Sequence, residues 1–80
     1  MANNFNYGVE RAIAVISRYG DESKELNLIS YGNRPPKYDL RTWKEQPDGG
    51  RIMLKGITLT REEAKALKNV LVEEFKQELD

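Results

Sequence analysis

The sequence contains no cysteine and no histidine among its 80 residues. No disulfide can therefore stabilise the fold, and the usual ligands of zinc and the usual thiol nucleophile are missing. The chain also lacks any apolar run of about 18 residues, so no membrane span is predicted. Its first ten residues have neither the basic nor the apolar part of a signal peptide. We expect a cytoplasmic protein without metal or cofactor.

The chain is short enough that we expect a single domain over residues 1–80. A domain of this size buries only about 60% of the surface that its unfolded chain exposes, and its stability is marginal. Without disulfides, association with a second copy would be a reasonable source of additional buried area.

An excess of charge of either sign is also missing, because 13 basic residues balance 13 acidic ones. The balance differs along the chain. Residues 1–59 carry nine basic and seven acidic groups, whereas residues 60–80 carry four basic and six acidic groups. Between residues 31 and 58 there are six basic and three acidic groups. This basic segment is compatible with nucleic-acid binding, although a bias of this size more often belongs to an ordinary solvated surface.

The last third of the chain has the pattern of an amphipathic helix. Thr60 and Glu63 have the spacing of a capping box, and residues 61–80 contain neither glycine nor proline. One apolar stripe runs along this segment at three- and four-residue spacing; it consists of Ala64, Leu67, Leu71 and Phe75, with Val70 and Leu79 beside it. We predict a helix over about residues 61–78.

The first two thirds of the chain have the pattern of β-strands separated by turns. The predicted strands cover about residues 9–18, 25–31, 37–44 and 51–59. Ala12 and Ala14 make the first segment compatible with a helix as well. Short turns between consecutive strands favour an antiparallel meander. The predicted fold class is α+β, with a four-stranded antiparallel sheet and one C-terminal helix that covers one of its faces.

The hairpin "KYDLRTWKEQPDGGRIMLKG" carries the only tryptophan, Trp43, among charged residues. Side chains alternate between the faces of a strand, so Trp43 shares a face with Lys37, Asp39 and Arg41. Leu40 assigns the opposite face to the core beneath the helix. Gly56 is a candidate for a bulge, so alternation is not extended beyond it.

Trp43 therefore has two interpretations. An indole among cations on an open sheet can stack on the bases of single-stranded nucleic acid while the cations bind phosphates. It can instead pack, with Arg41 over its ring as a cation–π pair. We predict that Trp43 is exposed, so that Trp43→Ala and Arg41→Ala weaken binding and leave the melting temperature nearly unchanged. A large loss of stability in Trp43→Ala would favour the packing interpretation. A protein-interaction module that uses the same sheet face remains the alternative.

An enzyme is not expected, and neither is a small-molecule substrate. Asp39 and Glu45 are the carboxylates available for acid–base chemistry in this hairpin, and they have no His or Cys partner. A sheet with one helix also offers little room for a pocket that excludes water.

The hairpin and the C-terminal segment after it resemble a known family. The segments "PKYDLRTW" and "KGITLT", with an acidic helix after them, resemble the single-stranded DNA-binding domain of the transcriptional coactivator positive cofactor four. The closer resemblance is to its small bacterial YdbC-like relatives. It covers about residues 26–75.

The resemblance implies a strongly curved sheet, a homodimer with helices packed together, and grooves for single-stranded DNA. Arg41 and Lys55 match the basic positions of the family. The eukaryotic pattern has its tryptophan one residue later, where this chain has Lys44. The eukaryotic serine-rich regulatory tail is missing, so a coactivator function is not carried over.

The sequence thus predicts sequence-independent binding of single-stranded DNA or RNA, with a role in transcription, replication or repair. The candidate nucleic-acid-binding residues are Arg34, Lys37, Arg41, Trp43, Lys44, Arg51 and Lys55. The candidate homodimer residues are Leu67, Val70, Leu71 and Phe75. No catalytic or metal-binding residue is predicted, and Tyr7, Tyr19 and Tyr31 are left without a role.

Overall fold

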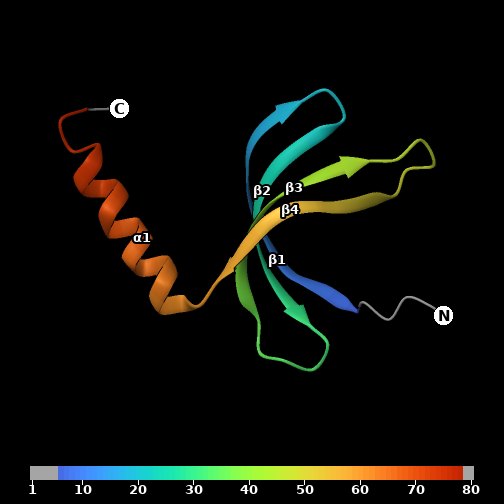
Figure 1. Cartoon of the computed structure of the whole chain (residues 1–80), viewed down its shortest axis with the longest axis horizontal. Helices are drawn as coiled ribbons and strands as arrows, with labels where there is room; N and C mark the ends of the chain where they lie inside the picture. Colours follow the sequence, from blue (N-terminus) through green and yellow to red (C-terminus); the bar gives the residue numbers. More distant parts are fainter. Residues whose placement is uncertain (1–5, 79–80) are drawn as a thin grey trace.

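Residues 6–78 fold into one four-stranded antiparallel sheet followed by a single helix (Figure 1). This computed structural model describes residues 6–78. Its strands and helix are β1 (Tyr7–Tyr19), β2 (Glu22–Tyr31), β3 (Lys37–Glu45), β4 (Arg51–Leu59) and α1 (Arg61–Glu74). The strands lie side by side in chain order, each antiparallel to the one before it. The predicted fold class is confirmed, and the first segment is a strand, so the alternative helix there is excluded.

The first two strands are longer than predicted. Strand β1 begins two residues earlier, and the tight turn after it lets β1 run to Tyr19 and β2 begin at Glu22. Only Gly20 and Asp21 separate β1 from β2. Gly20 has a φ of 62°, a backbone conformation that glycine adopts without steric cost and that two-residue hairpin loops require.

The predicted end of the helix is wrong, whereas its start is confirmed. The Glu63 backbone N–H donates to Thr60 Oγ1 at 3.1 Å, and the Thr60 N–H donates to Glu63 Oε1 at 2.8 Å. The helix ends at Glu74, with Phe75 as its C-cap, instead of near residue 78. Glu73 and Glu74 stand in the last turn without a basic residue, and the negative end of the helix dipole disfavours acidic side chains there.

The two faces of the sheet differ in chemistry. In the β2–β3 register Ser23 lies opposite Trp43, and Asn27 lies opposite Asp39. We call this side the polar face. The neighbouring pair of Leu26 and Leu40 points to the other side, which we call the apolar face. The buried side chains are on the polar face: Ser23, Glu25, Asn27, Ile29, Asp39 and Trp43.

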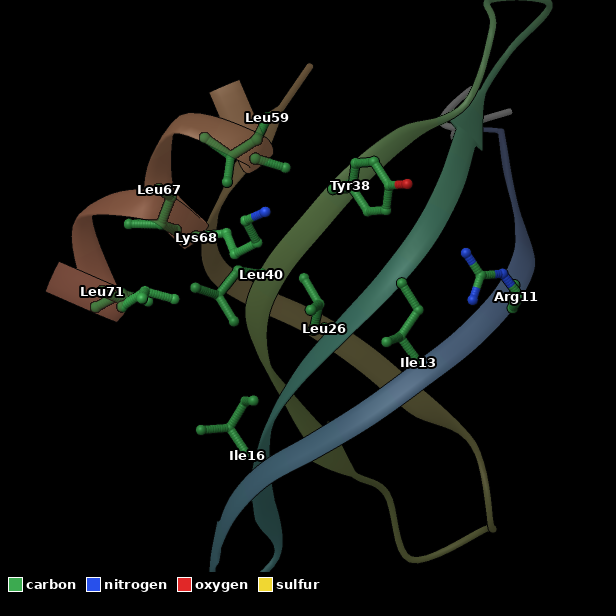
Figure 2. Close-up of a pocket in the computed structure, with 12 residues that line it drawn as sticks. Arg11, Ile13, Ile16, Leu26, Tyr38, Leu40, Leu59, Leu67, Lys68 and Leu71 are labelled. Atoms are coloured by element: carbon green, nitrogen blue, oxygen red, sulfur yellow. The ribbon is translucent and has the colours of Figure 1, made fainter. Parts of the chain in front are cut away.

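The expectation that α1 covers the apolar face as a closed layer is wrong. Only Thr60 separates β4 from α1, and the helix extends away from the end of the sheet (Figure 1). None of its residues is buried. A groove of about 640 Å³ remains between the helix and the apolar face. Figure 2 shows Leu26 and Leu40 on one wall of this groove, with Leu67 and Leu71 on the other.

The predicted irregularity at Gly56 is confirmed. The β3–β4 register shifts between Arg41 and Trp43, and Gly56 lies opposite Arg41. A Cβ atom on Gly56 would be 1.9 Å from Arg41 Cβ and 2.6 Å from the Leu40 carbonyl oxygen. The two strands can approach this closely only because residue 56 has no side chain.

Strand β1 contains three further irregularities that the sequence did not indicate. Its register against β2 shifts after Val9, after Ala12 and after Val15. Each shift leaves one extra residue on β1, which is the definition of a β-bulge; these residues are Glu10, Ile13 and Ile16. Ile13 and Ile16 line the groove beside α1 (Figure 2).

Candidate nucleic-acid interface

A buried carboxylate, Asp39, organises the middle of the polar face. Its side chain is 0% exposed. Arg41 Nε donates to Asp39 Oδ1 at 2.7 Å, and Arg41 Nη2 donates to Oδ2 at 2.8 Å. The Tyr31 hydroxyl donates to Oδ2 at 2.6 Å. A carboxylate with two guanidinium bonds and one phenol bond is well compensated for its burial.

Arg41 is therefore held within the sheet. Its remaining terminal nitrogen, Nη1, donates to the Leu54 carbonyl oxygen at 3.0 Å and so ties β3 to β4. The hydrogen bonds to Asp39 raise the pKa of the Arg41 guanidinium above its ordinary value. Arg41 lies on the predicted face, but most of its donors are already occupied, which leaves few of them for a phosphate.

Tyr31 should titrate at much higher pH than an ordinary tyrosine. Burial, followed by the hydrogen bond to Asp39, raises the pKa of Tyr31 from 10.0 to about 12. Because the folded-state pKa lies above the unfolded one, the stabilisation by the protonated phenol is complete below pH 10 and is lost as the pH rises to about 12. The difference in unfolding free energy between wild type and Tyr31→Phe should shrink across this window. A difference that stays constant from neutral pH through that range would contradict the assignment.

Trp43 lies on the predicted face, but the expectation that it is exposed is wrong. Its side chain is only 2% exposed. The guanidinium carbon of Arg51 lies 4.5 Å from the ring centroid, and the Tyr7 ring lies 6.0 Å away at an interplanar angle of 55°. The cation over the ring is thus Arg51, not Arg41. Within the described part of the chain, the buried Trp43 Nε1 has no hydrogen-bond acceptor.

Arg51 is fixed by a second buried carboxylate, Glu25. Arg51 Nη1 donates to Glu25 Oε2 at 2.9 Å, and Nη2 donates to Oε1 at 3.0 Å. The Ser23 hydroxyl also donates to Oε2, at 2.6 Å. Burial by itself would raise the pKa of Glu25, but the bonds from Arg51 and Ser23 outweigh it, and the pKa is lowered. Glu25 therefore stays ionised and keeps Arg51 in place.

Lys44 does not join the polar face. It lies next to Trp43 along β3, so its side chain points to the apolar face. Its partner in the register is Ile52 of β4. Its Nζ forms an exposed ion pair with Asp21 Oδ2 at 2.9 Å. This pairing raises the pKa of Lys44 and lowers that of Asp21. Of the two neighbouring positions, Trp43 is the one on the face with Arg41.

The other predicted basic residues lie at the margins of the sheet. Arg34 and Lys37 border a hollow of about 110 Å³ together with Tyr31, Pro35 and Thr58. Lys55 is exposed in the irregular stretch of β4 before Gly56. Between residues 6 and 78, none of Arg34, Lys37 and Lys55 forms an ion pair. These three cations can therefore bind phosphates without first releasing a carboxylate.

The tyrosines that the sequence left without a role divide into two groups. Tyr7 and Tyr31 lie opposite each other in the β1–β2 register, with ring centroids 6.4 Å apart, at the polar face near Trp43. Tyr19 is 88% exposed at the β1–β2 turn. Sequence reasoning also missed Glu25. The signal was its alternation with Asn27 and Ser23, which marks one face of β2.

The candidate dimer residues all lie on α1 or at its end, and all are exposed. Leu67 and Leu71 line the groove (Figure 2). Val70 and Phe75 are among the exposed large apolar residues of the chain, and Val70 lies in a separate hollow with Asn69, Glu73 and Glu74. The helix therefore presents apolar side chains that nothing in residues 6–78 covers.

The described residues contain neither a metal centre nor a membrane-spanning helix. Across residues 6–78, no group of three acidic side chains converges closely enough to hold a metal ion. In the same range, α1 is too short and too polar to cross a lipid bilayer.

The geometry defines a class of protein: a β-β-β-β-α module whose open sheet carries a cation–aromatic pair on one face and cations without ion pairs at its margins. The family model described as Transcriptional Coactivator p15 (PC4) matches residues 20–70. The chain belongs to this family, and the family resemblance found in the hairpin is confirmed. Membership suggests single-stranded DNA binding and a role related to transcription.

A relative with a similar sequence is an uncharacterized protein of Treponema pallidum (strain Nichols). It is 44% identical over 70 residues, which cover 86% of this chain and 79% of the relative. The matched family segment contains both buried carboxylates, Glu25 and Asp39, together with Trp43 and Arg51.

Proposed function

We propose that this protein binds single-stranded DNA, or RNA, without sequence preference, through the polar face of its sheet, and that it works in transcription, replication or repair. The observation that carries the proposal is the stack of Arg51 over Trp43 on an open sheet, with Arg34, Lys37 and Lys55 at its margins. Flat groups stack on bases regardless of sequence, and cations bind the phosphates. The proposed role is binding without catalysis, and the cytoplasmic location stays a prediction.

The deciding measurement is a titration of labelled oligo-dT and of a matched duplex at two salt concentrations. We expect tighter binding of the single strand, because a duplex hides the faces of its bases. The logarithm of its affinity should fall with the logarithm of salt by about 0.7 for each phosphate contacted. Equal affinity for the duplex, or affinity independent of salt, would reject the proposal.

The alternative is a protein-interaction module that uses the same sheet face. Tryptophan fluorescence separates the two functions, because Trp43 is the only tryptophan. Oligonucleotide binding next to the Arg51–Trp43 stack should quench its emission. Unchanged emission with saturating oligonucleotide would favour the alternative.

We further propose that two copies of the chain associate through α1 and the groove. The candidate dimer residues are between 38% and 61% exposed: Leu67, Val70, Leu71 and Phe75. The groove beside Leu67 is lined mainly by apolar side chains. Leu67 and Leu71 both line this groove, and exposed apolar patches mark interaction sites. A second copy would cover the groove with a self-complementary contact.

The oligomeric state tests this association. We expect a dimer by chromatography with light scattering at micromolar concentration, and a monomer for the double variant Leu67→Asp, Leu71→Asp. Ile52→Asp is the matched control, since Ile52 is an exposed apolar residue outside the groove. It should remain dimeric. A wild-type monomer at that concentration would remove the proposal.

A further inference from the structure

The interface raises the question of which group a base would stack on. Trp43 is 2% exposed, so its ring offers almost no surface to a ligand. Arg51 lies over that ring, and its side chain is 36% exposed. The side chain that solvent reaches at this point of the polar face is therefore that of Arg51, which ends in a flat guanidinium. Guanidinium planes stack on nucleic-acid bases as aromatic rings do.

The orientation of this guanidinium is fixed from two directions. Both of its terminal nitrogens donate to the two carboxylate oxygens of Glu25, at 2.9 and 3.0 Å, and a bidentate pair of this kind holds the guanidinium in a defined plane. The indole of Trp43 supports it from below at 4.5 Å. Glu25 is itself held by the Ser23 hydroxyl at 2.6 Å.

We propose that Arg51 is the stacking residue of this interface, and that Glu25 and Trp43 are positioning residues that hold its guanidinium flat for a base. The proposal rests on the nucleic-acid-binding function proposed above and specifies its contact. Glu25 is then required for binding even though its negative charge repels phosphate. A competing arrangement, in which Glu25 withholds Arg51 from phosphates and Arg51 moves away to uncover Trp43, has the opposite consequence.

Binding of labelled oligo-dT by wild type, Arg51→Lys and Glu25→Gln separates the two arrangements. Arg51→Lys keeps the positive charge and loses the planar guanidinium. We expect its affinity to fall roughly fivefold to a hundredfold, the range for loss of one stacked base, with the salt dependence unchanged. We expect Glu25→Gln also to weaken binding, although it makes the protein more positive.

Glu45→Gln is the matched control. Glu45 is exposed, lies opposite Arg51 in the register and forms no ion pair within residues 6–78, so this variant should bind as tightly as wild type or tighter.

The double variant Glu25→Gln, Arg51→Lys tests whether Glu25 acts through Arg51. If it does, Glu25→Gln should have little further effect once Arg51 is replaced. A purely structural role of Glu25 would give additive losses and would overturn the proposal. Tighter binding by Glu25→Gln, or wild-type affinity in Arg51→Lys, would also overturn it while leaving the binding function intact. Failure of wild type itself to bind oligo-dT would reject both.

Discussion

Replacing Asp39 by Ala is expected to remove a large part of the free energy of unfolding of the protein. The substitution leaves the Arg41 guanidinium, which is 15% exposed, without its carboxylate. Removing one partner of a buried ion pair costs about 3–5 kcal/mol, and small domains have only about 5–15 kcal/mol in total. The Tyr31 hydroxyl would lose its acceptor as well. Denaturant unfolding followed by circular dichroism should show a much lower midpoint.

Two companion variants make this result specific. Asp21→Ala removes a carboxylate from an exposed ion pair with Lys44, and such pairs contribute little, so its midpoint should stay near that of wild type. Asp39→Ala combined with Arg41→Met removes both charges and should recover part of the loss. An Asp39→Ala midpoint equal to wild type would mean that the buried pair does not hold the polar face together.

The second large effect is expected from Trp43→Ala. Truncation of a buried tryptophan costs about 3–5 kcal/mol through lost burial and the cavity left behind. Because Trp43 is almost completely buried beneath Arg51, we expect a lower unfolding midpoint together with weaker oligonucleotide binding. This reverses the expectation, drawn from the sequence, of an unchanged melting temperature.

A matched comparison for Trp43 is Tyr19→Ala. Tyr19 is the most exposed large aromatic residue of the described chain, and its removal should leave the midpoint unchanged. Trp43→Phe, which keeps a ring under Arg51, should lie between wild type and Trp43→Ala. A wild-type midpoint for Trp43→Ala would restore the interpretation of an exposed stacking residue.

The sequence predicted the elements well because their signals are local. The capping box at Thr60, the glycine in the β1–β2 turn and the alternation along β3 are each determined by a few neighbouring residues. The alternation also placed Asp39, Arg41 and Trp43 on one face, as the structure has them. The end of the helix was missed because acidic side chains in its last turn oppose an otherwise continuous apolar stripe.

The sequence failed where burial depends on contacts between strands. Alternation tells which side chains share a face, but not which face is covered. Leu40 suggested that the apolar face is the buried one, yet the buried face is polar. Its carboxylates are each paired with an arginine: Asp39 with Arg41, and Glu25 with Arg51, which lies 26 residues further along the chain. No local pattern identifies Arg51 as the partner of Glu25. For the same reason, the cation over Trp43 was misassigned to Arg41.

The three bulges of β1 have a geometric consequence for the whole sheet. Strand β1 uses 13 residues to run alongside the 10 residues of β2. When one of two hydrogen-bonded strands contains extra residues, the longer strand must bend, and the pair curves with it. The difference in the number of residues between β1 and β2 therefore contributes to the curvature of the sheet. Deleting Ile13 would remove one bulge and make Ala12 and Ala14 neighbours, still opposite Asn27 and Leu26. The faces of β1 would stay the same, and the sheet should bend less there.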